Sequence, residues 1–347
     1  MPPARASRFL DAAHRRPVDR TPIWMMRQAG RSLPEYRKFR ETHRLVDIVA
    51  DPDLCAEVTL QPVRRFAVDA AVMFADIMLP LRGMGVDFEL VDDVGPVIAA
   101  PIRTPADIDR LRVPAGEEAA PQVIAAVKRV VAASPVPVVC FSGAPFTLAS
   151  YLIEGRPSRE FKLVKAFMYA EPAAFEALLG KLAAMAAAYL AAQVAAGAAA
   201  IQLFDSWVGA LAREDYEARV QPHTRAIFDA TAGLGVPRIH FGTNTAGLLE
   251  AIAATGPEVV SLDWRLPLDV GWTAVGHDRG VQGNLDPAVL LGPAGVVRAR
   301  ARDVLRRAGG RPGHIFNLGH GVLPETPLDN LQLLVETVHQ WEPAHAA

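Results

Sequence analysis

The sequence predicts a single (β/α)8 TIM barrel that carries an insertion between its second and third strands. Eight short apolar or β-branched runs recur along the chain, bounded by proline, glycine or polar residues, with helix-like segments between most of them. This alternation is typical of parallel βα units, and eight units close the barrel. The expected strands are residues 22–28, 70–76, 136–142, 199–206, 238–243, 259–263, 280–284 and 314–320.

Polar side chains stand at the ends of all eight expected strands. Each of them alone is explained by a strand reaching the surface, but together they predict a site, because active sites of this fold lie at the C-terminal strand ends. The pattern does not identify the chemistry. The residues are Arg27 and Gln28, Asp76, Ser142, Asp205 and Ser206, Thr243 and Asn244, Asp263, Asn284, and His320.

The gap between the second and third expected strands is far longer than a usual βα loop. Residues 86–90 and 96–100 predict a β-hairpin there, and residues 119–133 predict a helix. An open doubly wound sheet also alternates strands and helices, but residues 25–31 lack the glycine-rich phosphate loop that it requires. We therefore expect one domain over residues 1–347, with flexible tails at 1–8 and 340–347.

The composition excludes several classes of protein. The chain has 347 residues, 51% hydrophobic and 21% charged, with a net charge of -2, which disfavours a disordered or nucleic-acid-coating protein. Its two cysteines, Cys55 and Cys140, lie far apart without neighbouring His or Cys ligands, so neither a disulfide framework nor a metal site is predicted.

The sequence also favours a cytoplasmic protein without membrane attachment. Residues 1–21 contain several arginines and no continuous apolar run of the secretory kind. Residues 182–204 are long enough to cross a bilayer, but they are mostly alanine and include Gln193 and Gly197. We interpret them as an alanine-rich helix that ends near Gly197 and leads into a short strand.

A cluster of basic residues follows the first expected strand. Arginine presents forked donors suited to carboxylate or phosphate, and Gly30 allows the backbone to approach a ligand closely. The cluster therefore predicts a multiply anionic small-molecule ligand, although Lys38 and Arg44 fit a solvated helix face. Between residues 27 and 44 the only acidic residues are Glu35 and Glu41, while the basic residues are Arg27, Arg31, Arg37, Lys38, Arg40 and Arg44.

Asp76 is an isolated carboxylate within the apolar run 73–78. Burying it is costly unless it is paired, so it either pairs with a nearby arginine or faces the cavity. In the cavity it would accept from N–H donors or stabilise a cation. Tyr151 follows the third expected strand, where its hydroxyl is able to donate to a carboxylate, unless the ring only anchors a helix.

Two further strand ends carry candidate residues. Asp205 and Ser206 supply an acid and a hydroxyl after the fourth strand, or they cap the helix that follows. His320 lies between Gly319 and Gly321, which leave it uncovered, so it either reaches a ligand or lies at the surface.

With these residues in place, the sequence resembles uroporphyrinogen decarboxylases over nearly its whole length, roughly residues 9–336. The matching stretches keep the order and approximate spacing of that family's motifs. They are RTPIWMMRQAGR at 20–31, LQPVRRF at 60–66 with Asp76 beyond it, GAPFTL at 143–148, QLFDS at 202–206 and NLGHG at 317–321.

The resemblance implies a homodimer of barrels that uses no metal or organic cofactor and converts uroporphyrinogen III to coproporphyrinogen III in haem biosynthesis. It implies catalytic roles for Asp76, Arg27 and Tyr151, with Asp76 accepting from the central pyrrole N–H groups. The residues implied to contact the substrate are Arg27, Gln28, Ala29, Gly30, Arg31, Arg40, Asp76, Tyr151, Phe204, Ser206 and His320.

The implied reaction needs an electron sink, which a pyrrole supplies once a ring carbon is protonated. The proton donor stays open between Arg27, a substrate carboxyl group and a relayed water, because a guanidinium is a poor acid. Two other functions share parts of this pattern. A related zinc-dependent methyltransferase would need a thiolate where Gly242 follows His240 and Phe241, and a non-catalytic tetrapyrrole carrier would need the arginines but not Asp76.

Overall fold

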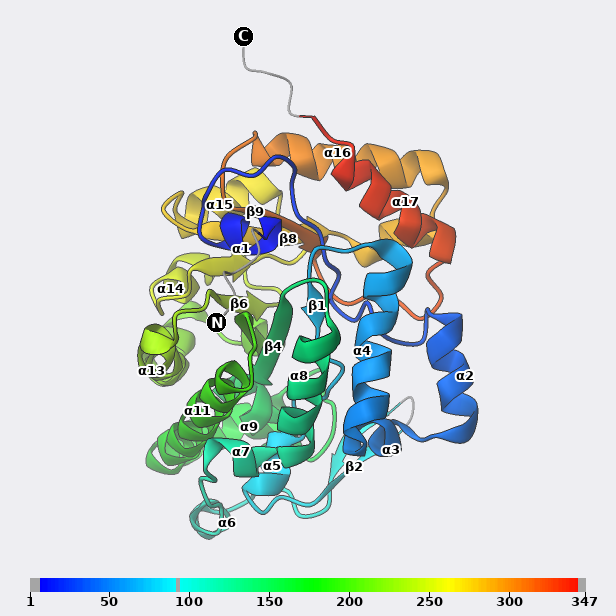
Figure 1. Ribbon diagram of the computed structural model, residues 1–347. Coiled ribbons are helices and arrows are strands. Elements are labelled where there is room, and N and C mark those ends of the chain that lie inside the picture. Colours follow the sequence, from blue (N-terminus) through cyan, green and yellow to red (C-terminus); the bar gives the residue numbers. More distant parts are fainter. Residues whose placement is uncertain (1–6, 92–93, 343–347) are drawn as a thin grey trace.

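Seven parallel strands form one curled sheet in the computed structural model, which describes residues 7–91 and 94–342 (Figure 1). The expected tails, 1–8 and 340–347, lie mostly outside the described residues; Arg8 already begins helix α1. The sheet order is β1-β4-β5-β6-β7-β8-β9. The strands are β1 Ala71–Val72, β4 Val138–Gly143, β5 Ala200–Asp205, β6 Arg238–Gly242, β7 Val259–Ser261, β8 Gly280–Leu285 and β9 His314–Leu318.

The predicted first strand, residues 22–28, is wrong as a regular strand. Ile23 makes a single parallel bridge to Phe316 of β9, and its carbonyl accepts from the backbone N–H of Asp69 beside β1. The segment therefore connects the two edges of the curled sheet through one residue. Beyond it the chain turns at Met26 and Arg27, and Arg27 has a φ of 58°, a left-handed conformation that no strand contains.

Two short strands follow β1 in the chain and pair with each other outside the main sheet. They are β2 Phe88–Val91 and β3 Gly95–Ile98, which run antiparallel. Helix α8 Pro121–Ala133 comes before β4. Strand β1 has only two residues where seven were expected, so Asp76 lies in the loop that follows it.

The helices form a layer around the sheet, with α16 and α17 packed side by side (Figure 1). Proline occupies the first turn of many of them, where its fixed φ suits helix initiation and no hydrogen bond is lost. Besides α8, the helices are α1 Arg8–Ala13, α2 Pro34–Thr42, α3 Leu45–Ala50, α4 Pro52–Phe66, α5 Pro80–Gly83, α6 Pro105–Asp109, α7 Gly116–Ala119, α9 Pro145–Glu154, α10 Lys162–Ala170, α11 Pro172–Ala195, α12 Arg213–Asp215, α13 Gln221–Thr231, α14 Leu249–Ala253, α15 Leu268–Val275, α16 Ala294–Ala308 and α17 Leu328–His339, with short 3-10 or π segments η1 Val208–Ala210, η2 Tyr216–Val220, η3 Ala232–Leu234 and η4 Pro287–Leu291.

The alanine-rich helix α11 ends at Ala195, and Gly197 follows with a φ of 109° before β5, as the sequence predicted. Within the described residues it is the one helix long and apolar enough to cross a membrane by length and composition. It packs against α9, α13 and β4, and half of its most apolar window is buried.

A buried polar layer crosses the inside of the curled sheet. The indole N–H of Trp24 donates to Gln282 Oε1 at 2.9 Å, and Gln282 Nε2 donates to Gln202 Oε1 at 3.0 Å and to Ser261 Oγ at 2.9 Å. Gln202 and Gln282 are fully buried, so these bonds satisfy amides that water cannot reach. The layer fixes the segment that contains Trp24 against β5 and β8.

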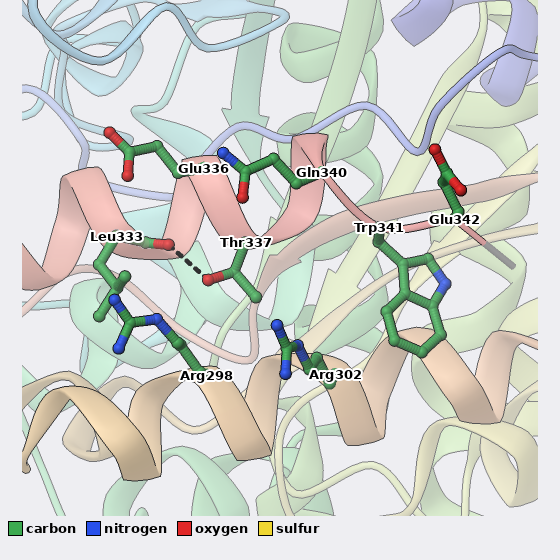
Figure 2. Close-up of a pocket in the computed structure, with 8 residues that line it drawn as sticks. All are labelled: Arg298, Arg302, Leu333, Glu336, Thr337, Gln340, Trp341 and Glu342. Carbon is green, nitrogen blue, oxygen red and sulfur yellow. Dashed lines mark hydrogen bonds between the residues drawn. The ribbon is translucent and has the colours of Figure 1, made fainter.

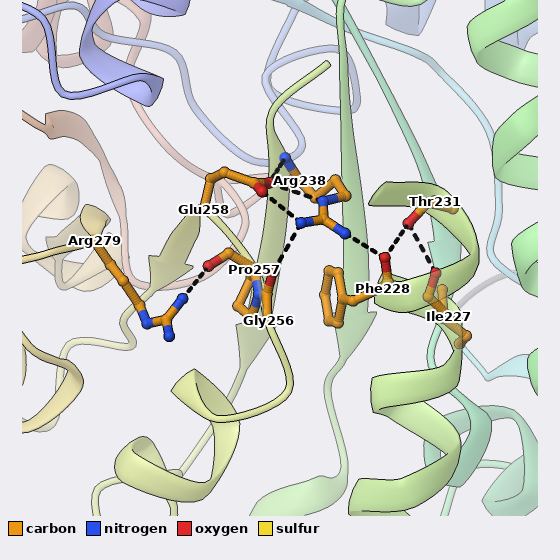
Figure 3. A network of polar contacts seen from close by, with 8 residues as sticks. All are labelled: Ile227, Phe228, Thr231, Arg238, Gly256, Pro257, Glu258 and Arg279. Atoms are coloured by element: carbon orange, nitrogen blue, oxygen red, sulfur yellow. Dashed lines mark hydrogen bonds and ion pairs between the residues drawn. The ribbon is translucent and has the colours of Figure 1, made fainter. Parts of the chain in front are cut away.

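A second network closes the N-terminal ends of β6 and β7 (Figure 3). The Arg238 guanidinium, at the start of β6, pairs with Glu258 at 2.5 Å and donates to the carbonyls of Gly256 and Phe228. The Arg238 side chain is buried, while Glu258 stays partly exposed, so the network holds the start of β6 against the loop that precedes β7.

Candidate active site

The turn after the Ile23 bridge presents Arg27 at the C-terminal strand ends. The side-chain amide of Gln28 is buried and fixes this turn: Oε1 accepts from the backbone N–H of Met25 and Nε2 donates to the carbonyl of Ala70, both at 3.0 Å. Gln28 therefore binds the protein's own backbone with both ends of its amide. Arg27 is exposed, and its side chain lies against Gly321.

Asp76 lies in the loop between β1 and α5, where it is partly recessed. Its Oδ1 accepts from the backbone N–H of Met78 at 2.8 Å. Burial raises the pKa of Asp76, while the Met78 hydrogen bond and the positive charge of Arg27 act in the opposite direction. The positive charge of Arg27 thus opposes the effect of burial on the Asp76 carboxyl group.

Tyr151 comes from α9, the helix that follows β4. Its ring meets Trp207 edge-on, with ring centroids 6.0 Å apart, and Trp207 donates its backbone N–H to Thr147 Oγ1 at 3.2 Å. Burial raises the pKa of Tyr151, the charge of Asp76 adds to the rise, and Arg27 opposes it. The Tyr151 hydroxyl is therefore a protonated donor at neutral pH, in electrostatic contact with both charged residues.

Aromatic rings line the same face over β4, β5 and β6. Phe204 lies between Phe141 and Phe241, with centroid distances of 5.2 Å and 5.7 Å, and Phe241 contacts the ring of His320 at 6.1 Å. Edge-to-face contacts of this kind hold aromatic rings in fixed orientations. The result is an apolar wall beside the charged residues.

His320 follows β9 and is half-buried at the end of this wall. The pKa of His320 is lowered to about 4, first by burial and then by the positive charges of Arg27 and Arg265, while Asp263 opposes the shift. The imidazole is therefore neutral at pH 7, so it is able to donate or accept a hydrogen bond without adding charge.

The other predicted residues occupy varied positions. Ala29 is buried and Gly30 is half-buried in the loop after Arg27, while Arg31 is exposed. On α2, Arg40 donates to the hydroxyl of Tyr36 at 3.5 Å. Ser206 is half-buried in the turn after β5, where its carbonyl accepts from the Thr243 hydroxyl.

Sequence reasoning missed Trp264 and Arg265, which follow Asp263 at the end of β7. The Arg265 guanidinium lies 4.0 Å from the centre of the Trp264 ring, and the Trp264 ring meets His320 edge-on at 6.4 Å. The available signal was an arginine two residues after a strand-end aspartate, a spacing that also suits an ordinary surface pair.

The geometry around β6 disfavours the zinc alternative. His240 is fully buried and faces the fully buried Asp205 at 3.6 Å, rather than the aromatic wall. A β-carbon at Gly242, where the thiolate would have to stand, would lie 2.7 Å from Thr245 Cγ2. Within residues 7–91 and 94–342, no three His, Cys, Asp or Glu side chains group as metal ligands.

A cavity of about 370 Å³ lies elsewhere, between α16 and α17 in the outer helix layer (Figure 2). Arg298, Arg302, Glu336 and Gln340 line it, and none of them comes from the strand ends. We place the candidate active site at the strand ends, because the recessed carboxylate, the arginine and the neutral histidine converge there.

Comparison with solved structures defines the class of fold. A methyltransferase from Methanosarcina mazei superposes with a TM-score of 0.77 over 95% of this chain and 96% of its own, at 20% sequence identity. A B12-independent methionine synthase from Shewanella superposes with a TM-score of 0.57 at 13% identity. At these identities the likeness concerns the α/β fold alone.

The sequence comparisons are more specific. The family model described as uroporphyrinogen decarboxylase matches residues 4–341. The uroporphyrinogen decarboxylase of Carboxydothermus hydrogenoformans is 52% identical over 334 residues, 96% of this chain and 95% of the relative. That of Streptomyces coelicolor is 52% identical over 335 residues, 96% and 94% of the two chains. This chain belongs to the uroporphyrinogen decarboxylase family.

Proposed function

We propose that this protein converts uroporphyrinogen III to coproporphyrinogen III by removing carbon dioxide from the four acetate side chains, a step in haem biosynthesis. Family membership over nearly the whole chain supports the reaction. The observation that carries the assignment of the site is the placement of four residues after strands of one sheet. Asp76 follows β1, Tyr151 lies on the helix after β4, His320 follows β9, and the Arg27 side chain lies against Gly321 beside His320.

The substrate is an octacarboxylate, and the basic loop suits it. Arg27, Arg31 and Arg40 would bind acetate and propionate groups, since guanidinium groups pair with carboxylates in fixed geometry. Ala29 and Gly30 would let the loop backbone approach the substrate. The role proposed for Gln28 is narrower than the family resemblance implied: its amide is engaged by Met25 and Ala70, so it serves the substrate by fixing the loop.

The aromatic wall suits the face of the macrocycle. Phe204 would pack against the tetrapyrrole, while Ser206 and neutral His320 would complete the cleft with hydrogen bonds that add no charge. Asp76 would accept hydrogen bonds from the inward pyrrole N–H groups, because one recessed carboxylate is able to accept from several donors. Tyr151 would donate its hydroxyl to the reacting carboxylate beside Asp76.

In the proposed chemistry, protonation of a pyrrole ring carbon creates a cation beside Asp76. The bond to the carboxyl group then breaks, carbon dioxide leaves, and the electron pair neutralises the cation. Loss of carbon dioxide leaves a methylene group double-bonded to the ring. This methylene group then takes up a proton to become a methyl group, and the ring carbon gives up the proton that it first received. Asp76 stabilises the cationic stage, in a site where limited solvation strengthens the attraction. Arg27 orients the acetate side chain that reacts. The proton comes from a substrate carboxyl group or from water, since a guanidinium group is a poor acid.

The chain would form one (β/α)8 barrel domain over residues 1–347, with the Ile23 segment in the place of the missing strand and the β2–β3 hairpin with α8 as its insertion. It would act as a homodimer in the cytoplasm, without a metal, an organic cofactor, nucleic acid or a membrane.

The experiment is anaerobic incubation of the purified, metal-stripped chain with uroporphyrinogen III, followed by mass spectrometry of the macrocycle. We expect four successive losses of carbon dioxide, ending at coproporphyrinogen III, with no increase in rate on adding zinc. Heat-denatured protein is the control for non-enzymatic loss. Unchanged substrate in the presence of tight binding would contradict the proposal and favour a tetrapyrrole carrier.

A further inference from the structure

Arg265 stands in the loop after β7 and is held there by two contacts. Its Nη1 pairs with Asp263 Oδ2 at 2.6 Å, and its guanidinium carbon lies 4.0 Å from the centre of the Trp264 ring. Asp263 is buried and also accepts the backbone N–H groups of Asn244 and Arg265. The Arg265 side chain nevertheless keeps 45% of its surface exposed.

The loop that carries Arg265 borders the candidate active site. The rings of Trp264 and His320 meet nearly at right angles, and a β-carbon at Gly319 would stand 2.3 Å from the Trp264 backbone nitrogen, so the two loops are in direct contact. Arg265 also helps to lower the pKa of His320, as Arg27 does, after the larger effect of burial. His320 therefore lies within the electrostatic reach of two guanidinium groups that come from different loops.

We propose that Arg265 is a further substrate-binding residue, which takes a peripheral carboxylate of the tetrapyrrole other than those bound by Arg27, Arg31 and Arg40. This inference rests on the proposed function. The Trp264 ring and Asp263 fix the plane of the guanidinium, so little side-chain entropy is lost when a ligand carboxylate binds its remaining donors. Asp263 shares its charge with two backbone donors as well as with Arg265, which leaves the guanidinium able to attract a second anion.

A purely structural role for Arg265 predicts a different effect of its substitution on stability and on affinity. If the residue only held the β7 loop through Asp263, its loss would lower stability and leave the affinity for the macrocycle unchanged. If it binds a carboxylate, its loss removes attraction present in both the ground state and the transition state, so KM rises while kcat stays the same. The split between KM and kcat therefore separates the two roles.

The test compares Arg265→Gln and Arg265→Met with Arg302→Met, an exposed arginine on α16 in the outer cavity (Figure 2). The glutamine keeps a donor for Asp263, and the methionine keeps an apolar stem against Trp264. Binding is followed by fluorescence quenching of uroporphyrin, the stable oxidised octacarboxylate, and turnover by steady-state kinetics with uroporphyrinogen III. Thermal unfolding of each variant accompanies both measurements.

We expect either Arg265 variant to raise the Kd for uroporphyrin and the KM by about tenfold, with kcat within about twofold of the parent. The salt dependence of Kd should become weaker, because one ion pair is lost. Equal Kd and KM in Arg265→Gln and Arg302→Met would overturn the inference even if the parent chain is an active decarboxylase. A parent that binds uroporphyrin but does not decarboxylate would refute the proposed function, while a raised Kd in the same variants would still support this binding site.

Discussion

The side chain of Arg27 lies directly over Gly321, so that a β-carbon at position 321 would stand 2.3 Å from Arg27 Cδ. Position 321 therefore needs a glycine, because any side chain there would displace the Arg27 guanidinium from the candidate active site. Arg27 itself adopts a left-handed backbone conformation, with a φ of 58°. Non-glycine residues rarely adopt it, and such residues gather at functional sites.

Substituting Gly321→Ala should therefore lower kcat/KM by roughly 10- to 100-fold, because Arg27 is moved away from the acetate side chain that reacts. The clashing atoms belong to a flexible side chain, so we expect Tm to change by only a few degrees. Gly295→Ala on α16 is the matched control, since a β-carbon there has nothing within 4 Å. Steady-state kinetics and thermal unfolding check both variants; parental kcat/KM in Gly321→Ala would contradict the contact's role.

Tyr151→Phe removes a hydroxyl and keeps the ring that packs against Trp207. We expect kcat to fall by about tenfold or more, as for the loss of one hydrogen bond to a reacting group, with little change in Tm. Tyr169→Phe is the control, because Tyr169 is exposed on α10 and bonds only Asp215 among the described residues. If the two variants had the same kcat, Tyr151 would be a packing residue.

Gln28→Leu should lower the stability of the folded protein. It leaves the N–H of Met25 and the carbonyl of Ala70 without their partners, and each unpaired buried group costs about 1–3 kcal/mol. We expect the free energy of unfolding to fall by a few kcal/mol and KM to rise, since the turn no longer fixes Arg27. Urea unfolding measures the first effect and kinetics the second. A variant with parental stability and a raised KM would show instead that Gln28 contacts the substrate directly.

His314 should make stability depend on pH. Burial lowers the pKa of His314 to about 4, below the value near 6.5 of an unfolded chain. Between these values the unfolded chain binds a proton that the folded chain does not, so stability falls as the pH drops from about 6.5 to about 4. The expected loss is on the order of 3 kcal/mol.

Urea unfolding of the parent and of His314→Gln between pH 4 and pH 7 measures this contribution as a difference in slope. The exposed His277→Asn is the control and should keep the parental slope. Identical slopes in all three proteins would show that His314 is not the group responsible. His320, with a pKa of about 4, adds to the slope in the same sense, so some pH dependence will persist in His314→Gln.

Strand pattern predicted the seven strands of the sheet because they are short buried runs of mostly apolar or β-branched residues, such as β4 and β7. It failed at residues 22–28, where the apolar run continues past Ile23 but the backbone leaves the sheet to present Arg27. Periodicity does not reveal that departure, since Trp24, Met25 and Met26 are buried as they would be in a strand.

Sequence reasoning likewise found some residues of the site and missed others. Charged residues in apolar surroundings, such as Asp76, were found because burying a lone charge needs a reason. Gln28 shows the limit: the family motif implies substrate contact, while the folded chain uses the amide to hold two backbone groups. Arg265 escaped notice because its stacking on Trp264 and its nearness to His320 arise from tertiary contacts between separate loops.

The central claim is that Asp76 stabilises a cationic stage of decarboxylation, while the arginines supply most of the attraction that holds the macrocycle. Asp76→Asn tests it most directly, because the amide oxygen still accepts from Met78 while the charge is removed. The exposed Asp53→Asn is the matched control. With kcat for uroporphyrinogen III and Kd for uroporphyrin measured together, we expect kcat to fall by about 10²- to 10³-fold or more and Kd to stay within about threefold. A variant that keeps its kcat, or that loses binding and turnover in equal measure, would contradict the account.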